Sequence, residues 1–179
     1  VEARGLAWVY DGRQAPPNVK WLKNKNYNKT NFIRFILDQL LVAQSVLSAI
    51  RWADVIHWHS HWALPGAFDV RYAAHLGKAG IIEFWGTDIR LPEIAKKDNP
   101  YITEMYKNSP DLIRSKEQIR ARQRMFADYG FSCLIPGYEL DDYIFKDIFP
   151  EFYHCGCPLV LSDFTVQYPD PNKKRPLVI

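Results

Sequence analysis

The residues with the clearest chemical potential are three alternating histidines, His57, His59 and His61. Imidazole nitrogens can bind a metal ion or hydrogen-bond a hydroxyl-rich ligand. Alternate residues of a strand point to the same face, so the three side chains share a face if one strand contains them all. A metal site there also needs a carboxylate, for which Asp88 is the candidate. The alternative is a packed or hydrogen-bonded His57 beside a His59 that faces a crevice, and we expect no metal.

A second polar group, Gly86-Thr87-Asp88 followed by Arg90, ends a run of apolar residues. Backbone N–H groups at such a junction can bind an anion or a hydroxyl-rich ligand, and the guanidinium of Arg90 fits a phosphate or a carboxylate. The alternative is that Asp88 caps the next turn and pairs with Arg90.

Tryptophans and one glutamate complete the candidate binding residues. Trp62 and Trp85 follow strand ends, where a ring can either stack on a sugar or pack in the core. Trp58 lies inside a predicted strand, so we expect it in the core. Glu139 can bind sugar hydroxyls or serve as the acidic residue at a helix start. The segment His154-Cys155-Gly156-Cys157 favours a turn over a metal clip, because no second cysteine cluster accompanies it.

Two short apolar runs, Val55 to Trp58 and Ile81 to Trp85, position these groups. They are too short for helices and are typical of buried parallel strands. The segment between them opens at Pro65-Gly66, carries apolar residues at helical spacing and closes at Gly77 and Gly80. In such a βαβ unit the carboxyl ends of both strands face one crevice. The histidines and the glycine turn should therefore lie together.

The rest of the chain has patterns that predict further elements. These are a strand at 6–10, a surface loop at 13–31, a helix at 32–52, at most short helices within 91–110, a helix from 109 or 111 to 129, strands at 131–135 and 157–161, and a short helix near 140–145. The helix at 32–52 carries more apolar surface than a narrow stripe, which predicts burial on two sides in a complete protein. Residues 168–176 are basic and punctuated by prolines, as in a linker.

Composition limits the class of protein. With 179 residues and 47% hydrophobic content, the chain suits one domain with a real core. Lys plus Arg number 23 against 20 Asp plus Glu, giving +3, and this scattered charge predicts no nucleic-acid partner. Three cysteines fit a reducing cytosol. The longest apolar segment, 32–52, is interrupted by charged and polar residues, so we expect no transmembrane span.

The order of these motifs resembles the amino-terminal domain of family-four glycosyltransferases, retaining enzymes of the two-domain GT-B fold. Three segments carry the resemblance: Asp54-Val55-Ile56-His57-Trp58-His59, Phe84-Trp85-Gly86-Thr87-Asp88-Ile89-Arg90, and Pro169-Asp170-Pro171 with the following residues to Ile179. The resemblance implies a Rossmann-like parallel sheet with helices on both faces over 1–168, lacking the family's first strand. It also implies that 169–179 is a linker into a missing carboxyl-terminal domain, so that the chain is truncated at both ends.

The same resemblance implies transfer of a sugar from a nucleotide-sugar donor to a glycan or lipid-linked acceptor, without a separate cofactor. In the family the acceptor sits mostly on this domain and the donor mainly on the other, so the isolated chain should be inactive. A cytoplasmic location follows, with peripheral association at the inner membrane face as an added expectation. The implied substrate-binding residues are His59, His61, Trp62, Trp85, Gly86, Thr87, Asp88, Arg90 and Glu139.

One departure from the family keeps other functions open. Trp85 stands where the family often has histidine. Imidazole can donate or accept a hydrogen bond, whereas indole offers one hydrogen-bond donor and a stacking face. We therefore assign no catalytic residue. The alternatives are a metal-dependent hydrolase built on His57, His59 and His61 with Asp88, and a non-catalytic sugar-binding module. We also expect the truncated chain to self-associate, because a missing strand leaves backbone groups unpaired and an apolar face uncovered.

Overall fold

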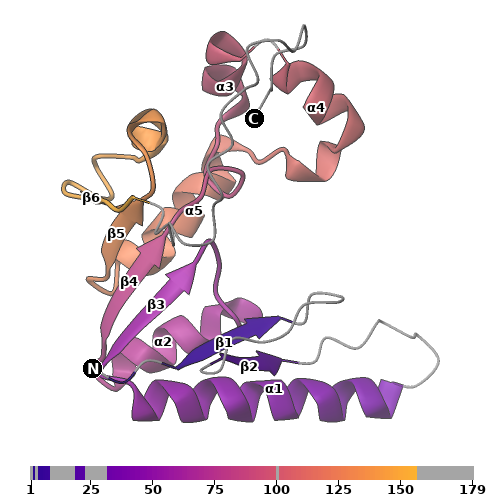
Figure 1. Cartoon of the computed structure of the whole chain (residues 1–179), viewed down its shortest axis with the longest axis vertical. Helices are drawn as coiled ribbons and strands as arrows, with labels where there is room; N and C mark the ends of the chain where they lie inside the picture. The colour runs from indigo at the N-terminus through magenta and orange to yellow at the C-terminus, as the bar shows by residue number, and fades with distance from the viewer. Residues whose placement is uncertain (1, 3, 9–18, 23–31, 100, 157–179) are drawn as a thin grey trace, which may run out of the picture.

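The computed structural model describes residues 2, 4–8, 19–22, 32–99 and 101–156 (Figure 1). All strand pairs in these residues are parallel. The smaller sheet pairs β1 (Gly5–Trp8) with β2 (Val19–Leu22). The larger sheet has the order β3-β4-β5-β6, formed by Val55–His59, Ala79–Glu83, Ser132–Ile135 and Tyr153–His154. The chain is therefore an α/β protein with parallel sheets, as predicted.

The described helices lie before the larger sheet or between its strands. They are α1 (Phe32–Trp52), η1 (Pro65–Ala67), α2 (Phe68–His75), α3 (Pro92–Asp98), α4 (Ile102–Asn108), η2 (Pro110–Leu112), α5 (Lys116–Ala127) and η3 (Tyr138–Tyr143). The prediction of a helix over 32–52 is confirmed, as are the short helices in the segment between β4 and α5. The central β3-α2-β4 unit is also confirmed, and Gly77 ends its helix with a φ of 66°.

Several local predictions are wrong. The loop predicted over 13–31 contains β2, which forms because it pairs with β1, a contact distant in sequence. The helix expected from 109 or 111 starts only at Lys116, because Pro110–Leu112 forms a separate 3₁₀ turn. The helix expected near 140–145 is the 3₁₀ helix η3. The strand predicted at 157–161 and the linker lie outside the described residues.

One face of the larger sheet carries the core. Trp58 of β3 is buried there, as predicted, and its indole N–H donates to the Asp69 carboxylate of α2 at 2.9 Å. The ring of Phe126, from α5, lies 5.6 Å from the Trp58 ring. Because α2 and α5 both contact Trp58, both helices cover the same face. Other buried side chains of the cluster are Val70, Ala73, Ile82, Ile119, Cys133 and Ile135.

The opposite face is open along β3. Val55 is 56% exposed, and His57 and His59, at the alternate positions that follow it, are exposed as well. In the part of the chain that the structure describes, these side chains of β3 are open to solvent, and helices on both faces of the sheet stay a prediction. Figure 1 shows α1 running beneath α2, which it contacts, and beneath the β1–β2 pair.

The long helix α1 buries one stripe. Val42, Val46 and Ile50 are buried at intervals of four residues, whereas Leu40 and Leu41 remain about 60% exposed. The two-sided burial predicted for a complete protein is not reached among the described residues. The exposed apolar side chains of α1 are part of the uncovered surface for which we expect self-association. That expectation stays a prediction.

The start of α5 allows a direct test of helix capping. The Ser115 hydroxyl accepts from the Gln118 N–H at 3.2 Å, and the Gln118 amide oxygen accepts from the Ser115 N–H at 2.9 Å. Loss of this reciprocal pair in Ser115→Ala should lower the free energy of unfolding by about 1 kcal/mol, measured by urea denaturation. Ser109→Ala is the matched control, because Ser109 precedes η2 without a side-chain capping bond. Equal losses in the two variants would contradict the assignment.

Candidate functional site

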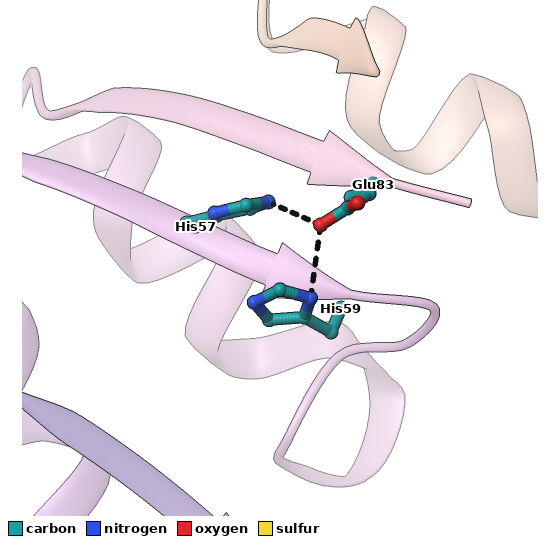
Figure 2. A group of neighbouring side chains, drawn as sticks. All are labelled: His57, His59 and Glu83. Atoms are coloured by element: carbon teal, nitrogen blue, oxygen red, sulfur yellow. Dashed lines mark ion pairs between the residues drawn. The ribbon is translucent and has the colours of Figure 1, made fainter. Parts of the chain in front are cut away.

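Two histidines and a glutamate meet at the carboxyl ends of β3 and β4. His57 Nε2 lies 3.1 Å from Glu83 Oε2, and His59 Nδ1 lies 3.0 Å from the same oxygen. Figure 2 shows the two imidazoles converging on this carboxylate. The two rings also lie close to each other, with centroids 4.2 Å apart. In the described residues this is the one group of three or more metal-ligating side chains close enough to share an ion.

Strand register produces this convergence. His59 is the direct partner of Glu83 across the parallel pair, and His57 precedes His59 by two residues. All three side chains therefore point to the open face of the sheet. Glu83 is nevertheless only 7% exposed, whereas His59 is 62% exposed. The cluster thus has a buried carboxylate and a solvent-facing imidazole.

Electrostatics favour a neutral His57. Partial burial lowers the pKa of His57 below its ordinary value, and the neighbouring His59 lowers it further, while Glu83 opposes both effects. A neutral imidazole keeps one nitrogen free to accept a hydrogen bond or bind a metal ion.

The third histidine does not join the cluster. Ser60 has a φ of 62° and directs the chain out of β3, while its N–H still donates to the Glu83 carbonyl at 2.8 Å. His61 instead lies beside the Trp62 ring, with its Nδ1 2.7 Å from the Trp62 carbonyl. The three histidines would share a face only if one strand contained them all, and β3 ends at His59.

Asp88 is directed toward the backbone of its own turn. Its buried carboxylate accepts from the Gly86 N–H at 2.8 Å and from the Trp85 N–H at 3.1 Å. Burial raises the pKa of Asp88, and these N–H donors partly offset the rise. One of the N–H groups that the sequence offered to a ligand, that of Gly86, is therefore occupied. The carboxylate binds the backbone of the residues before it, whereas the alternative expected it to cap the turn that follows.

The predicted pairing of Asp88 with Arg90 does not form among the described ion pairs. The Arg90 guanidinium lies beside Gly86 and 6.0 Å from the Tyr143 ring centre. Arg122, from α5, donates instead to the Asp88 carbonyl at 3.3 Å. Sequence reasoning did not single out Arg122, since nothing in the local pattern of α5 indicates which strand end it reaches.

The remaining predicted residues divide between the cluster and other places. Trp85 is 45% exposed, and its ring centre lies 6.5 Å from that of His59. Thr87 is exposed on the neighbouring turn. Trp62 is half-buried against Phe126, which favours packing over sugar stacking. Glu139 is exposed at the start of η3, where the helix-start alternative fits.

Glu83 is the functional candidate that sequence reasoning missed. It is the one acidic residue in the apolar run Ile81 to Trp85, and an acidic residue inside a buried strand is itself a signal. Its partners could not be inferred, because they depend on the register between two strands.

Comparison of the chain with protein-family models, with curated proteins and with solved structures gave no match. The structure itself defines the chain as an α/β protein with parallel sheets and a histidine–glutamate cluster at a strand end. Among the described helices, none combines the length and the apolar character needed to cross a bilayer.

Proposed function

We propose that the chain is the acceptor-side domain of a family-four glycosyltransferase, which transfers a sugar from a nucleotide sugar to a glycan or lipid-linked acceptor. One observation carries the proposal. The two motifs that resemble the family end neighbouring parallel strands, so that His59 of β3 and the turn Trp85-Gly86-Thr87-Asp88 after β4 lie at one edge. Ligands of open parallel sheets bind at this kind of edge.

The exposed groups at this edge suit a sugar. Trp85 offers a half-exposed ring on which a pyranose can stack, and His59 offers an imidazole beside it. Sugars are bound in this way because one face of the ring carries C–H groups while the hydroxyls need hydrogen-bond partners. Our proposal keeps the location cytoplasmic, with the acceptor at the membrane face if it is lipid-linked.

The test compares two proteins: the 179-residue chain and a longer natural form that includes a donor-binding domain. Both are incubated with a panel of UDP- and GDP-sugars and with glycan acceptors, and transfer and donor hydrolysis are measured. We expect transfer by the longer form and none by the 179-residue chain. Turnover by the 179-residue chain would contradict the proposal that the donor sugar nucleotide binds mainly to another domain. A longer form that binds glycans but uses no donor would favour the sugar-binding module.

Trp85 gives a more local prediction. In Trp85→Ala the affinity for the best-bound saccharide of a glycan array should fall about two- to tenfold, because an aromatic contact contributes about 0.5–1.5 kcal/mol. Isothermal titration calorimetry measures this. Trp52→Ala is the matched control, since Trp52 has a similar exposed fraction but is the last residue of α1, before β3 begins. An equal loss in both variants would exclude Trp85 as the stacking residue.

A further inference from the structure

Glu83 has a buried side-chain carboxyl group whose ion-pair partners are histidines. Its carboxylate is only 7% exposed, and in the described part of the chain no lysine or arginine forms an ion pair with it. The imidazoles of His57 and His59 contact this carboxyl group instead. A buried carboxylate without a compensating charge is costly, and proteins normally pair it or give it a metal ion.

The cluster has the spacing of a metal site. Ligand atoms around a tetrahedral zinc ion at about 2.0–2.1 Å lie about 3.4 Å apart. Here the two nitrogens lie 3.1 and 3.0 Å from the Glu83 oxygen, and all three atoms are within 4.8 Å of one another. We propose that His57 Nε2, His59 Nδ1 and Glu83 Oε2 form a three-ligand site for a divalent transition-metal ion of the zinc type.

The ligand types select the ion. Two imidazole nitrogens and one carboxylate suit zinc and related transition metals, whereas calcium and magnesium require oxygen ligands. His59 lies at the strand end with an exposed side chain, which leaves one side of the cluster open to solvent. Three protein ligands with an open fourth position can hold a water or an oxygen atom of a bound ligand.

This ligand set differs from the one that the sequence suggested. His61 leaves the strand at Ser60, and the Asp88 carboxylate is occupied by its own turn. Glu83 supplies the carboxylate instead. The site therefore does not require the hydrolase alternative, and it does not depend on sugar transfer, because metal binding is measured without any nucleotide sugar.

Zinc titration of the 179-residue chain, freed of metal by a chelator, tests the site. We expect one Zn²⁺ per chain by equilibrium dialysis. His59→Ala should lower the affinity at least about tenfold, since even the groups that only orient metal ligands change affinity about 10–100-fold. His59 is exposed, so its replacement should leave the fold intact, which circular dichroism checks. Glu83→Gln, which keeps the side-chain shape, should lower the affinity similarly.

Two matched controls separate this site from adventitious binding to surface histidines. His61→Ala removes a neighbouring exposed histidine. His154→Ala removes a histidine that pairs with the Asp141 carboxylate at 2.7 Å and has no third ligand among the described residues. Neither change should affect the affinity. A chain that binds no zinc, or one in which these controls weaken binding as much as His59→Ala does, would overturn the assignment.

The coordination itself gives a second readout. X-ray absorption of the zinc-loaded chain should show nitrogen and oxygen neighbours at about 2.0–2.2 Å, with an imidazole contribution that is reduced in His59→Ala. Sulfur neighbours at about 2.3 Å would instead place the ion on cysteine and contradict the proposal.

Discussion

Asp69→Ala is expected to lower the free energy of unfolding by about 3–5 kcal/mol, because three hydrogen-bond donors lose their common acceptor inside the protein. Asp69 is fully buried at the start of α2. Its carboxylate accepts three hydrogen bonds, from the Trp58 indole at 2.9 Å and from the Ala63 and Leu64 N–H groups at 2.8 and 3.1 Å. Without it, these donors lose their partner inside the protein, and each unsatisfied donor costs about 1–3 kcal/mol.

Urea denaturation followed by circular dichroism measures this loss. Asp54→Ala is the control, because Asp54 is an exposed aspartate just before β3. Asp69→Asn keeps one accepting oxygen and should fall between the two. If Asp69→Ala and Asp54→Ala unfold at the same urea concentration, Asp69 does not hold the connection between β3 and α2. Because this connection follows His59 directly, such a result would also weaken the account of how the cluster is positioned.

Phe126→Ala is expected to cost a similar amount, about 3–5 kcal/mol, through the cavity that it leaves. The Phe126 ring is fully buried and contacts the rings of Trp58, Trp62 and Phe84, at centroid distances of 5.6, 6.4 and 6.3 Å. Trp58 belongs to β3, Trp62 to the turn after it, and Phe84 directly follows β4. One side chain of α5 therefore supports both strands that carry the site.

The measurement is again the urea midpoint, together with the near-ultraviolet dichroism that reports on tryptophan packing. Phe126→Leu removes less volume and should cost less than the alanine change. Tyr129→Ala provides the surface control, since Tyr129 is 40% exposed on the next turn. A Phe126→Ala protein as stable as Tyr129→Ala would show that α5 does not hold the core together.

The local elements could be predicted because local patterns produce them. Helix α1 follows from apolar periodicity over its 21 residues, and α2 ends where Gly77 adopts a positive φ. Strands β3 and β4 follow from short apolar runs between turn residues. Strand β2 was missed because its residues form a strand only when β1 pairs with them. Propensity in a four-residue segment is weaker than such a long-range contact.

Part of the candidate site also followed from the sequence. Two consecutive parallel strands bring their carboxyl ends to one edge, so the sequence determined that His59 and Trp85 lie near each other. It also determined that His57 and His59 share a face, since they alternate along a strand. Both inferences need only the chain order and the geometry of a βαβ unit.

The partner of the histidines was decided by the tertiary structure alone. Glu83 meets His59 because the register sets them opposite each other, and a slip of one residue would turn Glu83 to the other face. The positive φ of Ser60 turns the chain out of β3, so His61 does not join His57 and His59. Hydrogen bonds within its own turn hold the Asp88 carboxylate away from the cluster. Sequence pattern fixes which face a side chain takes within its own strand, but strand register and backbone turns decide which side chains from different segments meet.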